Sequence, residues 1–325
     1  MKNTRYDFDP KEYSPKFETR FLAPKYWATW LGILFAIPFS LMPLRLHRWL
    51  ALCAAKKVVS RSKGQAQRAR VNLSYCYPKM PQKEREEIIY NMISTAGAYL
   101  MRFPLLTLRN RKWLARNTVV NGLENFNEQR STNQNIIFLV PHTWSVDVFA
   151  MLLASQGHSV CTMVKSQKNP LSEWAMSKQR KRYGGRLYER SGGIKPFIKA
   201  VNDGYIGYFL PDQDHGAKKS VFVDFCATTK ATLPVMGFLA KTTNSKIIPL
   251  WTEFDIKTGR FVIDIYPALE NFPTETPEGD ATAMNRFIEM CCQDKPEQYM
   301  WNLKLLHSQQ DGSYIYDTPL PEEPQ

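Results

Sequence analysis

The segment that most constrains the fold runs from Asn135 to Asp147 and reads Asn-Ile-Ile-Phe-Leu-Val-Pro-His-Thr-Trp-Ser-Val-Asp. Five consecutive apolar residues, several of them β-branched, suit a short buried strand, and the proline that follows them ends it. Asp147 suits a helix N-terminus, and the apolar run 148–155 comes directly after it. The segment therefore predicts a strand, a turn and a helix, with His142 at the carboxyl end of the strand.

His142 and Asp147 are the candidate catalytic residues. Open α/β sheets hold ligands at the carboxyl ends of their strands, where the connections leave a crevice with free backbone N–H groups. If the turn folds back, the Asp147 carboxylate fixes the imidazole tautomer, and the other ring nitrogen can accept a proton from a hydroxyl group. The alternative, a structural histidine and a helix-capping aspartate, stays open on these residues alone.

The rest of the chain alternates short apolar runs with longer amphipathic stretches. Strands are expected at 119–123, 159–164, 205–210, 247–251 and 261–266, and helices at 170–183, 233–241 and 281–292. This alternation predicts an α/β fold in which a mostly parallel sheet is flanked by helices. With 325 residues, 44% of them hydrophobic, the chain can bury a sizeable core.

The N-terminal part differs in composition from the rest. Residues 1–25 are polar and rich in proline, and we expect an irregular arm. Residues 26–44 contain no charged side chain and carry aromatic residues at one end, which predicts a membrane anchor helix. Two prolines within this run leave an in-plane anchor or a buried hairpin as alternatives to a full span. The α/β domain is expected over 45–310, and a flexible tail over 311–325.

The net charge of +13 implies an acidic partner, which could be a nucleic acid, an anionic lipid, a phosphorylated substrate or an acidic protein. Basic residues without any acidic residue occupy 45–70, a bias that suits anionic headgroups and a cytoplasmic location. The six cysteines form no CxxC pair, which favours reduced thiols.

Two further polar clusters are candidate binding sites. The glycine-rich segment 184–196 and the helix before it carry cations that could hold a phosphate or stabilise an oxyanion: Arg180, Arg182, Arg186, Arg190 and Lys195. The strand expected at 205–210 ends in a second cluster, which contains Asp212, Asp214 and His215. A solvated helix end and ordinary turn residues are the alternatives.

Several segments of the chain together resemble one known family. His142-Thr-Trp-Ser-Val-Asp147 fits a His-x4-Asp motif, and it occurs with Pro211-Asp-Gln-Asp-His-Gly216. Further matching segments are Pro24-Lys-Tyr-Trp27, Asn72-Leu-Ser-Tyr-Cys-Tyr-Pro78, Gly192-Gly-Ile-Lys-Pro-Phe-Ile198, Phe222-Val-Asp-Phe225 and Pro296-Glu-Gln-Tyr299. The chain resembles the late acyltransferases of lipid A biosynthesis, within the glycerolipid and lysophospholipid acyltransferase superfamily. The first two motifs have the form of the myristoyltransferase type rather than of the sister lauroyltransferases.

The resemblance implies transfer of a fatty acyl chain, myristoyl in this type, from acyl carrier protein. The acceptor would be a hydroxyl group of a Kdo-bearing, lauroylated lipid A precursor. The resemblance also implies a Gram-negative inner-membrane protein with its catalytic domain on the cytoplasmic side. We expect no cofactor beyond the acyl carrier protein thioester, no metal and no nucleic-acid partner.

Two rival functions remain open at this point. A metal-dependent hydrolase of lipids or phosphate esters would use nitrogen and oxygen ligands from both motifs: His142, Asp147, Asp212, Asp214 and His215. A non-catalytic basic membrane protein that recruits an acidic partner would explain the charge and the anchor. It would leave the two polar clusters at strand ends unexplained.

Overall fold

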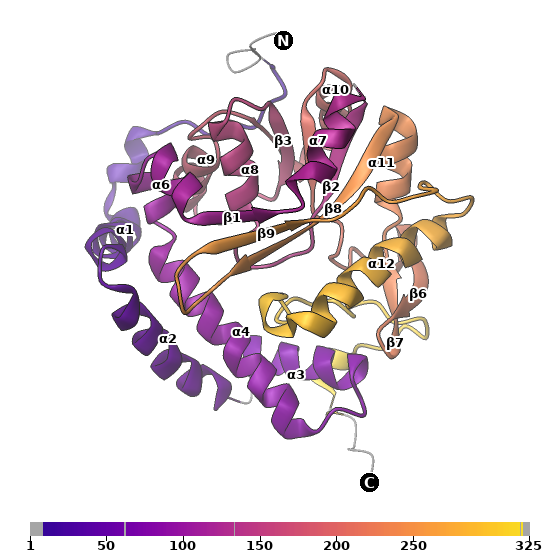
Figure 1. The fold of residues 1–325 in the computed structure, drawn as a ribbon. Helices are drawn as coiled ribbons and strands as arrows, with labels where there is room; N and C mark the ends of the chain where they lie inside the picture. Colours follow the sequence, from indigo (N-terminus) through magenta and orange to yellow (C-terminus); the bar gives the residue numbers. More distant parts are fainter. Residues whose placement is uncertain (1–8, 62, 133, 319, 321–325) are drawn as a thin grey trace.

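A computed structural model of the chain describes residues 9–320 except 62, 133 and 319 (Figure 1). Its strands are β1 (Thr118–Asn121), β2 (Asn135–Leu139), β3 (Val160–Val164), β4 (Arg186–Glu189), β5 (Ile206–Phe209), β6 (Val221–Phe225), β7 (Thr228–Thr232), β8 (Ser245–Phe254) and β9 (Phe261–Ile265). Its α-helices are α1 (Trp27–Ser40), α2 (Leu44–Val59), α3 (Gln65–Cys76), α4 (Gln82–Arg102), α5 (Leu105–Leu108), α6 (Arg111–Arg116), α7 (Leu123–Ser131), α8 (Asp147–Ser155), α9 (Pro170–Arg180), α10 (Lys195–Asn202), α11 (Val235–Thr243) and α12 (Pro277–Asp294).

Seven strands form one sheet in the order β1-β9-β8-β2-β5-β3-β4. All of its neighbouring pairs run parallel except β8 and β9. Helices cover both faces, so the predicted α/β fold is confirmed. The sequence did not predict β6 and β7, which form a separate antiparallel hairpin.

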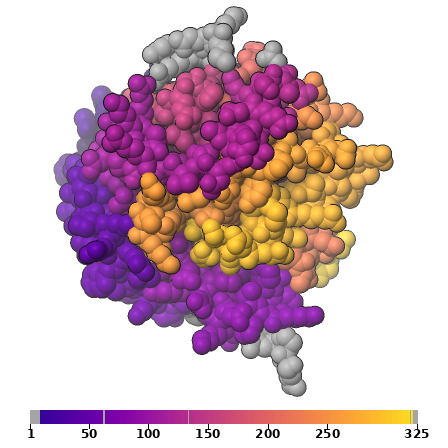
Figure 2. Space-filling model, in the orientation of Figure 1, coloured from indigo at the N-terminus to yellow at the C-terminus, as the bar shows by residue number. Residues whose placement is uncertain are grey.

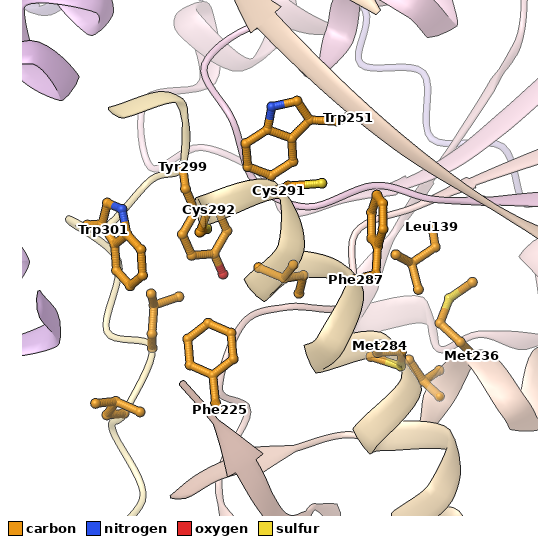
Figure 3. Close-up of a cluster of buried hydrophobic side chains, with 14 of the residues drawn as sticks. Leu139, Phe225, Met236, Trp251, Met284, Phe287, Cys291, Cys292, Tyr299 and Trp301 are labelled. Carbon is orange, nitrogen blue, oxygen red and sulfur yellow. The ribbon is translucent and has the colours of Figure 1, made fainter. Parts of the chain in front are cut away.

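The strand β2 shows how the sequence divides the core between the two faces. Its alternate residues point to opposite sides. Ile136 and Phe138 join a cluster with α7 and α8, whereas Ile137 and Leu139 join a cluster with α10, α11 and α12. Figure 3 shows the second cluster, in which Leu139 lies near side chains of α11 and α12. Because both faces of β2 are buried, its sequence is continuously apolar instead of alternating.

The helix predicted over 26–44 is shorter than expected. Helix α1 has 14 residues and ends at Ser40, and a turn with Pro43 at its end leads into α2. At 1.5 Å per residue this helix is about 21 Å long, against roughly 30 Å for the hydrocarbon core of a bilayer. In the parts of the chain that the structure describes, no helix has the length and apolar character needed to cross a membrane.

Both terminal segments pack against the α/β domain where they are described. The Tyr13 N–H donates to the Leu187 carbonyl at 2.7 Å, which adds the arm to the free edge of β4. In the predicted tail, Ile315 and Tyr316 are buried, and the Tyr316 hydroxyl donates to the Asn72 side chain at 2.6 Å. The arm predicted as irregular contains two short 3-10 turns, Thr19–Leu22 and Pro24–Tyr26.

Candidate active site

The candidate site lies where β2 and β5 end side by side. These strands are parallel, and Leu139 is in register with Phe209. His142 and Asp212 each lie three residues beyond that pair, so both loops leave the same edge of the sheet. The His142 backbone N–H donates to Asp212 Oδ2 at 2.8 Å, and the imidazole Nδ1 is hydrogen-bonded to Asp212 Oδ1. The carboxylate that orients His142 therefore comes from the second predicted cluster.

The predicted pairing of Asp147 with His142 is wrong in this structure. Asp147 begins α8, and its carboxylate accepts a hydrogen bond from Arg180 Nε at 3.0 Å. The Tyr208 hydroxyl donates to the Val146 carbonyl at 2.6 Å, which fixes the backbone just before Asp147. Asp147 raises the pKa of Arg180, and the two residues form an ion pair in the wall of the cavity that His142 also lines.

Asp212 is held as an anion in a fully buried position. Burial by itself would raise the pKa of this carboxyl group, but His142 and the buried Lys230 outweigh that effect and lower it to about 2. Lys230 comes from β7, and its Nζ donates to the Asp212 carbonyl oxygen at 2.8 Å. A carboxylate of this kind keeps the proton on Nδ1, which leaves Nε2 as the basic nitrogen of the ring.

Two more segments complete the surroundings of the imidazole. Gln213 places its side-chain nitrogen 3.2 Å from His142 Nε2. The Met300 N–H donates to the His142 carbonyl at 3.0 Å, and Tyr299 forms a β-bridge with Thr143. Sequence reasoning did not predict Gln213 or Lys230 as site residues. The alternating residues on either side of Cys226 could have indicated the hairpin that carries Lys230. They could not have indicated that Lys230 contacts Asp212.

A cavity of about 900 Å³ opens next to His142. Polar residues in its lining are His142, Asp147, Thr162, Lys165, Gln167, Arg180, Arg186, Arg190, Gln213, His215, Lys218 and Lys219. Apolar residues and glycines also line it, among them Ala150, Met151, Ala154, Val160, Val164, Gly184, Gly185 and Leu187. Such a combination suits a ligand with an apolar chain and a charged head.

The structure separates the predicted cations into two groups. Arg180, Arg186 and Arg190 line the cavity next to His142, whereas Arg182 lines a different pocket and Lys195 is an exposed residue at the start of α10. Arg186 lies over the Tyr205 ring at 4.4 Å and within 3.6 Å of Asp9, so the arm compensates its charge.

The second acidic cluster also divides into different roles. Asp214 accepts hydrogen bonds from the Gly216 N–H at 2.9 Å and from the Ser308 N–H at 2.6 Å, which is the behaviour of a structural turn residue. His215 lies in the cavity, and its Nδ1 is 3.3 Å from Arg190 Nη2. Desolvation and Arg190 lower the pKa of His215, so this ring is neutral at pH 7.

The five side chains of the metal-dependent alternative do not converge on one point, although His142 and Asp212 are in contact. Asp147 is paired with Arg180, and Asp214 is bound by Ser308. Among residues 9–320, apart from positions 62, 133 and 319, no group of three or more His, Cys, Asp or Glu side chains could hold a metal ion. The geometry therefore gives the hydrolase alternative no support.

Comparison with known proteins identifies the family of the chain. The profile of the family described as "Bacterial lipid A biosynthesis acyltransferase" matches residues 14–308. The "Lipid A biosynthesis myristoyltransferase" of Escherichia coli is 39% identical over 301 residues, which cover 93% of each chain. A "Lipid A biosynthesis acyltransferase" of Haemophilus influenzae is 36% identical over 94% of this chain and 95% of its own length. The "Lipid A biosynthesis lauroyltransferase" of Escherichia coli is 26% identical over 92% of this chain and 97% of its own.

Proposed function

The chain belongs to the family of bacterial lipid A biosynthesis acyltransferases, and we propose that it transfers a myristoyl chain from acyl carrier protein. The proposed acceptor is a hydroxyl group of a Kdo-bearing, lauroylated lipid A precursor. One observation carries this proposal: an imidazole fixed by a buried carboxylate lies in the wall of a cavity that is partly polar and partly apolar. The test is mass spectrometry of the lipid product after the purified protein has reacted with mixed acyl carrier protein thioesters.

In the proposed mechanism, His142 acts as a general base. Its Nε2 takes the proton of the acceptor hydroxyl while the hydroxyl oxygen attacks the thioester carbonyl carbon. The tetrahedral intermediate then collapses, the carbon–sulfur bond breaks, and the departing thiolate takes the proton from the imidazolium. Asp212 stabilises that imidazolium, as a buried aspartate does in a serine triad. Among the cavity cations, we assign Arg180 and Arg190 to the oxyanion and to acceptor phosphates.

We propose that the cavity next to His142, which we call the acyl cavity, holds the acyl chain along its apolar lining residues. Along α8, positions 147, 150, 151 and 154 lie on one helical face, so the cavity follows this helix for about 10 Å away from Asp147. Val160 and Gly185 lie where β3 and β4 begin, at the end of the strands opposite to the end where His142 lies. The cavity wall that they form with Ala154 is where we place the methyl end of the chain.

Substitution of Ala154 by methionine is expected to shorten the preferred acyl chain. The added methylenes would occupy the far end of the cavity, so the ratio of kcat/KM for a 12-carbon over a 14-carbon donor should rise roughly tenfold, about the effect of one or two methylenes. Gln156→Met adds the same side chain at an exposed position outside the cavity and should leave the ratio unchanged. An unaltered ratio in a folded Ala154→Met protein would show that the chain lies elsewhere.

Charge reversal at Arg190 is expected to weaken acceptor binding. Arg190 lines the polar part of the cavity and is exposed, so Arg190→Glu should raise the acceptor KM roughly tenfold at low salt and less at high salt. Lys195→Glu makes the same charge change just outside the cavity and is the control. If kcat alone falls and the KM stays constant, Arg190 stabilises the oxyanion and the acceptor headgroup binds at another place.

We further propose that the protein acts at the cytoplasmic surface of the inner membrane of a Gram-negative cell. Support comes from α1, on which Trp27, Leu31, Leu34 and Phe35 form one exposed apolar face at helical spacing. The basic segment 45–70 follows immediately and could contact anionic headgroups. Contact of this kind corresponds to the in-plane anchor that the prolines of the segment allow.

A further inference from the structure

A second pocket, of about 670 Å³, lies between the N-terminal arm and the last turns of α9. Its walls come from arm residues 14–17, from Thr107 and from the part of α9 that starts at Trp174. It shares no lining residue with the acyl cavity. The proposed reaction does not use this pocket, which we call the cationic pocket.

The cationic pocket has an excess of positive charge. Four of its lining residues are cations, namely Lys16, Lys178, Lys181 and Arg182, and no Asp or Glu lines it in the described part of the chain. Lys181 forms an ion pair with Glu12 and donates to Ser14 Oγ at 3.1 Å. Within residues 9–320 as described, neither Lys16 nor Lys178 has an ion-pair partner.

The composition of the pocket suits a phosphate group. Ser14 and Thr107 line it together with the cations, and Ser177 also lines it, although its hydroxyl group donates to Glu173 Oε1 at 2.9 Å. Cations at the end of α9 partly offset the dipole of that helix, but Lys16 comes from the arm and has no such role. Ammonium and guanidinium groups that converge with hydroxyl donors are the usual partners of phosphate oxygens.

Aromatic side chains connect the cationic pocket to the exposed face of α1. In the wall of the pocket, the Phe17 and Trp174 rings lie 5.3 Å apart. Trp174 in turn lies 6.4 Å from Trp30 of α1, and the Trp30 indole donates to the Phe21 carbonyl at 2.8 Å. In the space-filling view, α1 lies at the indigo margin of the molecule (Figure 2). The cationic pocket and α1 are therefore neighbours on one side of the protein.

We propose that the cationic pocket binds the phosphate of an anionic phospholipid while the exposed face of α1 enters the adjoining hydrocarbon. This inference rests on the membrane contact proposed above. A lipid is the ligand in which a phosphate and hydrocarbon chains occur side by side, as the pocket and the helix face do here. Tryptophan rings between the pocket and the exposed face of α1, such as Trp174 and Trp27, suit the interface between headgroups and acyl chains.

Vesicle binding of the full chain tests the proposal. Lys16→Gln together with Lys178→Gln should weaken binding to phosphatidylcholine vesicles that contain phosphatidylglycerol by roughly fivefold for each lysine. Binding to pure phosphatidylcholine vesicles should not change. The control is Lys241→Gln together with Lys246→Gln, which removes two exposed charges from α11 and β8, on the other side of the molecule (Figure 1). Equal losses in both variants would show general attraction and would overturn the site.

Titration with soluble ligands separates the possible sources of phosphate. Short-chain phosphatidylglycerol below its micelle concentration should bind the wild type with one-to-one stoichiometry and the pocket variant at least tenfold more weakly. Inorganic phosphate should bind more weakly than the lipid. Equal affinity for both, or lipid binding that survives in the pocket variant, would overturn a lipid headgroup site.

A transfer assay in detergent keeps this inference apart from the proposed function. The pocket variant should retain wild-type acyl transfer to a detergent-dispersed acceptor, because no membrane is present. If the pocket variant loses acyl transfer in detergent as much as it loses vesicle binding, the cationic pocket binds a reaction substrate and the inference is overturned. Phospholipid binding by a protein without any transferase activity would instead leave the inference standing and refute the proposed function.

Discussion

Replacement of His142 by alanine is expected to lower acyl transfer by about two to four orders of magnitude, the usual cost of losing a general base. A buried carboxylate, Asp212, positions the His142 imidazole in the wall of the acyl cavity. Without the imidazole, the acceptor hydroxyl would have to lose its proton to water. The measurement is the initial rate of lipid product formation with a purified acyl carrier protein thioester. Thermal unfolding followed by circular dichroism should remain cooperative at a lower midpoint, because the buried Asp212 loses the imidazole but keeps Lys230.

His158→Ala is the matched control for this experiment. His158 lies between the end of α8 and the start of β3, and its ring packs edge-on against Phe126 at 5.7 Å. The substitution removes a histidine from the same α/β domain at a position that does not line the acyl cavity. If the His142→Ala protein keeps more than about a tenth of the wild-type rate, His142 is not the base.

Substitution of Asp212 by asparagine should be almost as harmful, although Asp212 touches no substrate in the proposed reaction. An amide can still hydrogen-bond Nδ1, but it favours the wrong tautomer and cannot stabilise the imidazolium, which costs up to about four orders of magnitude in kcat in a serine triad. The loss should fall on kcat, with the acceptor KM close to the wild-type value. Asp214→Asn is the neighbouring control, because that carboxylate binds Gly216 and Ser308 instead of the imidazole. Equal losses of kcat in both variants would mean that the loop as a whole, and not the Asp212 charge, supports activity.

The Asp212 carboxylate also predicts a dependence of stability on pH. Its pKa of about 2 in the folded protein lies below the ordinary value of 3.8, so its contribution is complete above pH 4 and is lost as the pH falls toward 2. The contribution is about 2 kcal/mol. Asp212→Asn should remove this part of the acid sensitivity, which denaturant unfolding of both proteins between pH 5 and pH 2 would measure.

Patterns close together in the sequence determined much of the fold and the position of the site. The continuously apolar run of β2 predicted a buried strand, and the alternation of strands and helices predicted a mostly parallel sheet. Because parallel strands end at one edge, the polar residues after β2 and β5 were expected at that edge, and His142 and Asp212 lie there. These conclusions depend on local periodicity and on proline, which a single sequence displays directly.

Only the tertiary structure decided which groups meet. Asp147 is five residues from His142 and Asp212 is 70 residues away, yet Asp212 holds the imidazole because β5 is the neighbour of β2 in the sheet. Likewise Arg180 and Arg182 lie two residues apart and line different pockets, because α9 ends at Arg180 and Arg182 lies in the turn that follows it. The order of strands and the packing of α9 depend on the free energy of the whole core. No local pattern encodes that quantity, so the partners of each charged group could not be read from the chain alone.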